Sequence, residues 1–127
     1  MSSTTTGLGR HLLLECHGCA PGNLLDAEAL ERLLRRAAKL AGAHVLFGHF
    51  HPFGPAQGVT GVLLLRESHI SIHTWPEHGY AAVDVFMCGA TQPENAVAEI
   101  VRGLGPQRHE IHDVQRGVGL VALMTHC

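Results

Sequence analysis

Apolar residues recur at helical spacing in two segments of the chain. The first segment starts after Asn23 or Asp26, either of which is a suitable helix cap, and ends at Gly42. Its apolar positions are Leu30, Leu33, Leu34, Ala37, Leu40 and Ala41. The second segment opens at Pro93 and stops at Gly103. Each pattern predicts an amphipathic helix that lies on a sheet, with its charged side in solvent.

Apolar runs and the alternation of polar and apolar residues predict strands around these helices. Alternation is clearest after residue 67, where Ile70 and Ile72 alternate with His69 and His73. We expect strands at residues 10–15, 43–50, 59–65, two within 67–88 that join at the turn 75–79, and two more at 107–115 and 117–124. Short turns between adjacent strands favour antiparallel pairing. The prediction is a single α+β domain over residues 1–127, with a largely antiparallel sheet and two helices on one face.

The composition narrows the possible partners. Lys, Arg, Asp and Glu make up 16% of the 127 residues, against a usual share of about 25%. A surface so short of charge favours coverage by a second copy of the chain, and we expect a homo-oligomer. The net charge of -2 provides no positive electrostatic potential to attract a phosphate backbone, so nucleic acid is not an expected partner.

No segment predicts a membrane span. The longest purely aliphatic run, residues 62–65, is far shorter than the roughly 20 residues that a spanning helix needs. Residues 1–6 lack the basic start and apolar middle of a secretory signal. We therefore expect no membrane partner and a cytoplasmic location.

Four cysteines and 11 histidines are the residues from which a metal site would be built. Cys16 and Cys19 form a C-x-x-C pair, which is half of a zinc site or a redox pair. No second pair follows at motif spacing, so a metal site would have to recruit distant groups such as Cys127. We expect no metal, and a small metal-binding module resting on these cysteines stays open as the non-enzyme alternative. The scattered histidines at positions 11, 44, 49, 51, 109 and 112 are interpreted as structural.

The segment from Glu67 to Glu77 gathers hydroxyls, imidazoles and carboxylates within eleven residues. The polar face of an edge strand is one interpretation. A serine hydrolase is another, but the G-x-S-x-G motif is absent. Ser68 and His73 lie five residues apart, on opposite faces of a regular strand, so their spacing alone does not build a catalytic dyad.

A longer stretch around this segment resembles a known family. Residues 64–77, LLRESHISIHTWPE, and residues 79–89, GYAAVDVFMCG, closely resemble the processing and active-site block of prokaryotic S-adenosylmethionine decarboxylase proenzymes. The resemblance extends less tightly upstream and covers most of residues 9–90. It implies a two-layer α/β sandwich, which agrees with the fold that the apolar pattern predicts.

The resemblance implies a precursor that cleaves itself between Glu67 and Ser68. Ser68 Oγ would attack the carbonyl of Glu67 and convert the amide to an ester, and β-elimination and hydrolysis would leave a pyruvoyl group at residue 68. The products would be a β chain of residues 1–67 and an α chain of residues 68–127. Chemically, such an attack needs a strained peptide, donors for the developing oxyanion and a group that moves protons.

Further roles are implied by the same resemblance. His73 matches the proton carrier of processing, and Thr60 matches a position, usually serine, that assists cleavage. The covalently bound pyruvoyl cofactor would form a Schiff base with the substrate and accept the electron pair released with carbon dioxide. Cys88 matches the donor that then protonates the substrate carbon. The family positions in or near the substrate pocket are matched by Phe53, Trp75 and Glu77.

The implied activity is decarboxylation of S-adenosylmethionine, which makes the aminopropyl donor for spermidine synthesis. The family's assembly implies a dimer of cleaved αβ units that share active-site groups across their interface. The chain departs from the family pattern in three places: the turn 53–58 looks one residue longer, His78 stands where Tyr is frequent, and Met87 stands where Thr is frequent. The departures around Phe53 and His78 leave open a pyruvoyl-dependent decarboxylase of ornithine or arginine on the same scaffold.

Overall fold

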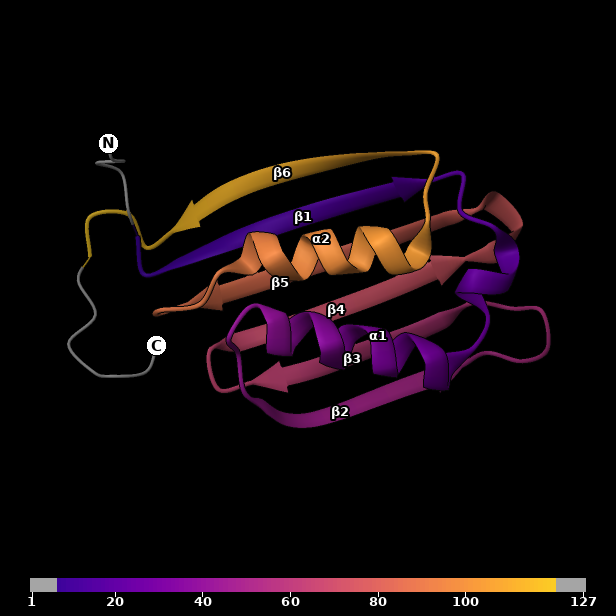
Figure 1. Ribbon diagram of the computed structural model, residues 1–127, viewed down its shortest axis with the longest axis horizontal. Helices are drawn as coiled ribbons and strands as arrows, with labels where there is room; N and C mark the ends of the chain where they lie inside the picture. The colour runs from indigo at the N-terminus through magenta and orange to yellow at the C-terminus, as the bar shows by residue number, and fades with distance from the viewer. Residues whose placement is uncertain (1–6, 121–127) are drawn as a thin grey trace.

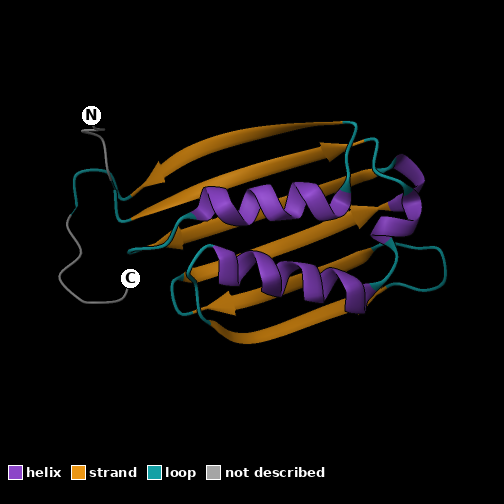
Figure 2. Cartoon of the chain, in the orientation of Figure 1, coloured by secondary structure: helices purple, strands orange, loops and turns teal. Residues whose placement is uncertain are grey.

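One antiparallel sheet with helices on one of its faces makes up the chain (Figures 1 and 2). The computed structural model describes residues 7–120, and within this range six strands pair in the order β2-β3-β4-β5-β1-β6. The strands are β1 (Gly9–His17), β2 (Val45–Pro52), β3 (Val59–Leu65), β4 (Ser68–Trp75), β5 (Tyr80–Cys88) and β6 (Arg108–Arg116). The helices are α1 (Ala27–Leu40) and α2 (Pro93–Leu104), with short 3₁₀ turns η1 (Pro21–Leu24) and η2 (Pro76–His78). The predicted two-layer α+β architecture is confirmed.

Helix α1 begins where the sequence offers a cap. Asp26 Oδ1 accepts hydrogen bonds from the backbone N–H groups of Glu28 and Ala29, at 3.0 and 3.2 Å, and these satisfy donors that the first turn leaves open. Asn23, the other candidate, instead donates to the carbonyl of Leu104 at 3.2 Å. Asp26 is therefore the cap, and Asn23 connects η1 to the end of α2.

Helix α2 ends one residue later than predicted. Gly103 lies inside the helix. A Cβ at this position would stand 2.4 Å from the side chain of Leu33 of α1, so the glycine allows the two helices to pack closely. The chain leaves the helix at Gly105, which has φ +60°. Neither α1 nor α2 is long and apolar enough to cross a membrane.

The core lies between the helices and the sheet. Alternate residues of the central strands, such as Leu63, Ile70 and Val85, are fully buried beneath α1 and α2. Their neighbours on the same strands point to the opposite face, which no helix of the described range covers (Figure 1). Half-exposed apolar side chains lie on this open sheet face, including Leu64 and Trp75.

The predicted last strand, residues 117–124, is wrong over residues 117–120. This segment forms a turn in which Leu120 N donates to the carbonyl of Gly117 at 3.1 Å. Gly117 and Gly119 both have positive φ values, 69° and 84°, which end the extended backbone of β6. Residues 121–124 lie outside the described range.

Candidate active site

The hairpin between β3 and β4 carries the predicted cleavage junction. Leu65 at the end of β3 pairs with Ser68 at the start of β4, so Arg66 and Glu67 form the turn between them. Ser68 has φ +141°, a backbone conformation that a residue with a Cβ rarely adopts. Such a conformation costs about 1–3 kcal/mol and persists only where the surroundings hold it. The strain therefore lies at the residue whose hydroxyl is predicted to react.

The carbonyl oxygen of Glu67 lies against the end of β5. The backbone N–H of Cys88 donates a hydrogen bond to it at 3.2 Å, and Cys88 Sγ also lies 3.2 Å from this oxygen. A backbone donor in this position stabilises the negative charge that develops on the oxygen when a nucleophile attacks the carbon. The structure thus brings Glu67, Ser68 and Cys88 together.

A cavity of about 410 Å³ opens beside these residues, and we call it the junction pocket. It lies where β1 and β4 begin and β3, β5 and β6 end. Its walls are Leu8, Gly9, Leu65, Arg66, Ser68, Phe86, Cys88, Arg116 and Gly117. The guanidinium of Arg116 lies over the ring of Phe86, 5.5 Å from its centroid. The residues that are predicted to react therefore face a space large enough for part of a small ligand.

The side chain of Glu67 is held from the other direction by the segment that connects α1 to β2. His44 Nδ1 lies 2.8 Å from Glu67 Oε2, and the backbone N–H of His44 donates to Glu67 Oε1 at 3.0 Å. Burial alone would raise the pKa of the Glu67 carboxyl, but the hydrogen bonds from His44 outweigh this and hold the pKa below its ordinary value. Glu67 is therefore an anion at neutral pH, and His44 Nδ1 carries the proton in this contact because a carboxylate only accepts.

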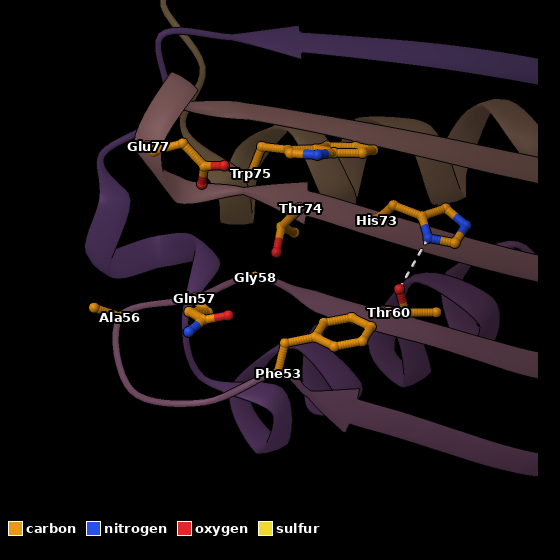
Figure 3. A pocket seen from close by; sticks show the side chains of 9 residues that line it. All are labelled: Phe53, Ala56, Gln57, Gly58, Thr60, His73, Thr74, Trp75 and Glu77. Atoms are coloured by element: carbon orange, nitrogen blue, oxygen red, sulfur yellow. Dashed lines mark hydrogen bonds between the residues drawn. The ribbon is translucent and has the colours of Figure 1, made fainter.

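The predicted processing residues Thr60 and His73 lie at the other end of β3 and β4. They face each other across the β3–β4 ladder, and Thr60 Oγ1 is 3.1 Å from His73 Nδ1 (Figure 3). Residues opposed in an antiparallel ladder project to the same face, so the register of the two strands determines this contact. A hydroxyl bonded to an imidazole is a suitable pair for moving a proton.

The three predicted substrate-binding residues surround a second cavity, of about 530 Å³, which we call the aromatic pocket (Figure 3). Its walls are Phe53, Ala56, Gln57, Gly58, Thr60, His73, Thr74, Trp75 and Glu77. Phe53 is 56% exposed and Trp75 is 40% exposed, so both rings present a large area to whatever enters. Aromatic faces beside a carboxylate suit a flat base and a sugar hydroxyl.

Sequence analysis missed the residues that support the indole of Trp75. The ring of Tyr80 lies 5.4 Å from that of Trp75, and its hydroxyl donates to Glu15. Burial and the bond to Glu15 raise the pKa of Tyr80 to about 12, so the phenol stays protonated. No motif marks Glu15, because the contact joins residues that are 65 positions apart in the sequence.

The structure does not bring His73 and Thr60 to Ser68 within one chain. Ser68 and His73 occupy the two halves of β4, five residues apart, which is roughly 17 Å along an extended strand. The junction pocket and the aromatic pocket also have no residue in common. One chain therefore holds the predicted site as two separate parts.

Cys16 and Cys19 are free thiols buried in the hydrophobic core. Burial raises the pKa of Cys16 to about 12, with further contributions from Cys19 and Glu15, and burial also raises the pKa of Cys19. In residues 7–120, no group of three or more His, Cys, Asp or Glu side chains is arranged to hold a metal ion. Cys127, the third cysteine of the metal-binding alternative, lies outside this range.

Comparison with known proteins identifies similar sequences and a similar structure. A family model described as S-adenosylmethionine decarboxylase matches residues 10–117. An S-adenosylmethionine decarboxylase proenzyme of Methanococcus maripaludis strain S2 is 49% identical over 112 residues, which cover 87% of this chain and 91% of the relative. One of Parasynechococcus marenigrum is 52% identical over 110 residues, covering 86% of this chain and 85% of the relative. The crystal structure of the adenosylmethionine decarboxylase from Aquifex aeolicus superimposes with a TM-score of 0.82 at 38% identity, covering 96% of this chain and 99% of that one.

Proposed function

The chain belongs to the S-adenosylmethionine decarboxylase family, and from this premise we propose that it cleaves itself between Glu67 and Ser68 and then decarboxylates S-adenosylmethionine. The observation that carries the self-cleavage is the geometry of the junction. Ser68 has a strained φ of +141°, and the carbonyl that precedes it accepts a hydrogen bond from Cys88 N–H. Strain at the nucleophile and a donor on the attacked carbonyl lower the barrier to the same step.

Self-cleavage proceeds through bonds that the chain itself supplies. Ser68 Oγ adds to the carbonyl carbon of Glu67, and the oxyanion that forms is stabilised by Cys88 N–H. The C–N bond then breaks, so the amide becomes an ester and the nitrogen of Ser68 becomes an amine. Loss of the Ser68 α-proton then expels the main-chain carboxylate of Glu67, which becomes the C-terminus of the β chain, and leaves dehydroalanine at residue 68. Water hydrolyses the imine tautomer of this dehydroalanine at its α-carbon and releases ammonia. The α chain of residues 68–127 then begins with a pyruvoyl group.

The residues around the junction suit the chemistry that this group brings. A pyruvoyl ketone supplies an electron sink for the pair released as carbon dioxide leaves the substrate. Cys88, in its thiol form, protonates the substrate carbon from the wall of the junction pocket.

The aromatic pocket suits S-adenosylmethionine better than it suits ornithine or arginine. Adenine stacks on Phe53 or Trp75, and the carboxylate of Glu77 accepts hydrogen bonds from ribose hydroxyls. Ornithine has no flat group to cover the two exposed rings, and the planar guanidinium of arginine is much smaller than adenine. The product on S-adenosylmethionine is the aminopropyl donor for spermidine synthesis.

A complete active site forms when two copies meet through their open sheet faces. The junction pocket and the aromatic pocket lie at opposite ends of β3 and β4. A twofold axis between the two sheets, running across the strands, places the junction pocket of each copy opposite the aromatic pocket of the other. Contact between the faces also covers exposed apolar side chains such as Phe47 and Leu64, which are opposed in the β2–β3 ladder.

The mass of the purified chain tests this proposal. We expect the 13.6 kDa precursor to convert with time into two fragments that separate between residues 67 and 68. Cyanoborohydride with S-adenosylmethionine should then add the mass of substrate-derived amine to the α chain alone. The S68A variant is the control and should stay uncut and untrapped. A wild-type chain that stays whole, or an α chain that begins with ordinary serine, contradicts the proposal.

Carbon dioxide release separates the possible substrates. S-adenosylmethionine, ornithine and arginine are offered side by side to the processed enzyme, and release from S-adenosylmethionine alone is expected. Release from ornithine or arginine in its place would support the other decarboxylase on this scaffold.

A further inference from the structure

His44 is bound to both residues of the turn that precedes Ser68. Its carbonyl accepts a hydrogen bond from the backbone N–H of Arg66 at 2.9 Å. Its own backbone N–H and its ring Nδ1 hold the two carboxylate oxygens of Glu67, at 3.0 and 2.8 Å. The segment between α1 and β2 thus binds the turn of Arg66 and Glu67 through both the backbone and the side chain of His44.

The contacts with Glu67 involve its side chain, whereas its reacting carbonyl has a different partner. The Glu67 carbonyl is bonded to Cys88 of β5, and the Glu67 side chain is bonded to His44. Glu67 is therefore held at both ends, with its side chain only 13% exposed. Fixing a residue at two points restricts rotation of the peptide that joins it to Ser68.

Such restriction matters because the turn is short and the next residue is strained. A strained φ at Ser68 relaxes if either neighbour is free to rotate, and it persists where contacts on both sides prevent this. Reaction also requires Ser68 Oγ to stay within attacking distance of the Glu67 carbonyl carbon, a condition that small displacements destroy. An anchor on the Glu67 carboxylate serves both needs.

Resting on the proposed self-cleavage, we propose that His44 is a positioning residue for that reaction: its ring Nδ1 clamps the Glu67 carboxylate and so holds the Glu67 carbonyl in place for attack by Ser68. His44 does not touch the reacting atoms. It acts through Glu67, and its action ends when the chain is cut.

The ring of His44 contributes little to folding, which makes the proposal testable. The His44 side chain is 66% exposed, and a contact of this kind near solvent adds little to global stability. The backbone hydrogen bonds of His44 to Arg66 and Glu67 remain in any variant other than proline. Substitution of the ring therefore removes the Nδ1 contact and leaves the fold.

The decisive experiment measures the half-time of self-cleavage, by intact mass, for three substitutions at this position. H44A removes the donor, and cleavage should slow roughly 10-fold, the order expected for one charge-assisted hydrogen bond. H44N places an amide N–H where Nδ1 stood and should restore most of the rate. H44Q places its amide one bond further out, so its rate should stay close to that of H44A. H109A, an exposed histidine remote from the junction, is the matched control and should cleave like wild type.

Two further measurements exclude a merely structural effect. The melting temperatures of the uncut H44A and H44N precursors, each combined with S68A to prevent cleavage, should agree within about one degree. After complete processing, carbon dioxide release per pyruvoyl group should equal that of wild type. In an E67A background, where the carboxylate is gone, H44A should produce no additional slowing.

Each outcome has a definite meaning. Equal cleavage rates for wild type and H44A overturn the proposal, as does slowing by H44A that persists in the E67A background. Equal slowing by H44A and H44N also overturns it, because the donor would then be irrelevant. A wild-type chain that never cleaves contradicts the proposed function itself, so the two failures are distinguishable.

Discussion

Ser68 combines two properties that ordinarily exclude each other, a nucleophilic side chain and a glycine-like backbone. Its φ of +141° is maintained by pairing with Leu65 and Met87 on either side and by the anchored turn before it. The end of a folded strand thus holds a strained backbone torsion at the residue that follows the bond proposed to break. The proposed cleavage would release this constraint, which would favour the forward reaction.

The two roles proposed around Cys88 belong to different atoms and can be separated by mutation. We expect C88A to cleave itself at close to the wild-type rate, since the oxyanion donor is the backbone N–H. Decarboxylation should fall by about 100-fold or more, the usual cost of losing a positioned acid. Fragment formation by mass and carbon dioxide release in reducing buffer check the two parts. Failure of C88A to cleave would assign the side chain a part in processing.

The Thr60–His73 pair gives a second prediction at this scale. Threonine is stiff at χ1, so the hydroxyl has few orientations toward His73 Nδ1. T60S should cleave at least as fast as wild type, whereas T60A, which removes the hydroxyl, should slow cleavage about 10-fold or more. The half-time of precursor loss measures both. T60A cleavage at the wild-type rate would remove Thr60 from the proposed mechanism.

At the scale of elements, α1 and α2 are joined by a charge network above the sheet. Glu99 of α2 accepts a hydrogen bond from Arg36 of α1 at 3.2 Å and is also bonded by Arg102. Hydrogen bonds from Arg102 and Arg36 hold the pKa of Glu99 below its ordinary value of 4.5, although burial opposes this. The charged form is thus favoured in the folded state.

This network predicts a pH-dependent difference in stability. A carboxyl whose pKa is lower in the folded state adds stability above its unfolded pKa and loses it as pH falls through the folded pKa. We expect E99Q to melt below wild type at pH 7, and the difference should shrink as the pH drops below about 4.5. Melting curves by circular dichroism at several pH values check this. An unchanged difference across this range would show that the charge of Glu99 is not its cause.

For the whole molecule, the two pockets at opposite ends of the hairpin are the main feature. Ser68 and Cys88 line one, and His73 and Trp75 line the other. A protein that placed all four in one pocket would be complete as a single chain. This arrangement instead makes activity a property of the proposed dimer.

Mixed dimers test this directly. S68A and W75A should each be nearly inactive alone, but co-produced they form hybrids in which one site combines an intact Ser68 with an intact Trp75 from the other copy. With half of the dimers hybrid and one of their two sites intact, about a quarter of wild-type activity should return. S68A with C88A is the matched control and should recover nothing, since both changes affect the same pocket. Absence of recovery in the first mixture would contradict the shared site.

The sequence by itself determined the local structure. Helical spacing of apolar residues, a cap at Asn23 or Asp26, and Pro93 predicted both helices, and apolar runs together with alternation predicted strands where β1 to β6 lie. These features depend on contacts within one or two turns of the backbone, so a short window of residues contains the information. The odd spacing of Ser68 and His73 likewise determined that they do not form a dyad within one strand.

Tertiary structure alone decided which distant residues meet. Cys88 reaches the Glu67 carbonyl across 21 positions, and His44 reaches the Glu67 carboxylate across 23. Sequence analysis interpreted His44 as one structural histidine among several, because nothing near it marks the contact. Strand order and register fix such pairs, and they result from packing of the whole sheet beneath its helices rather than from any local pattern.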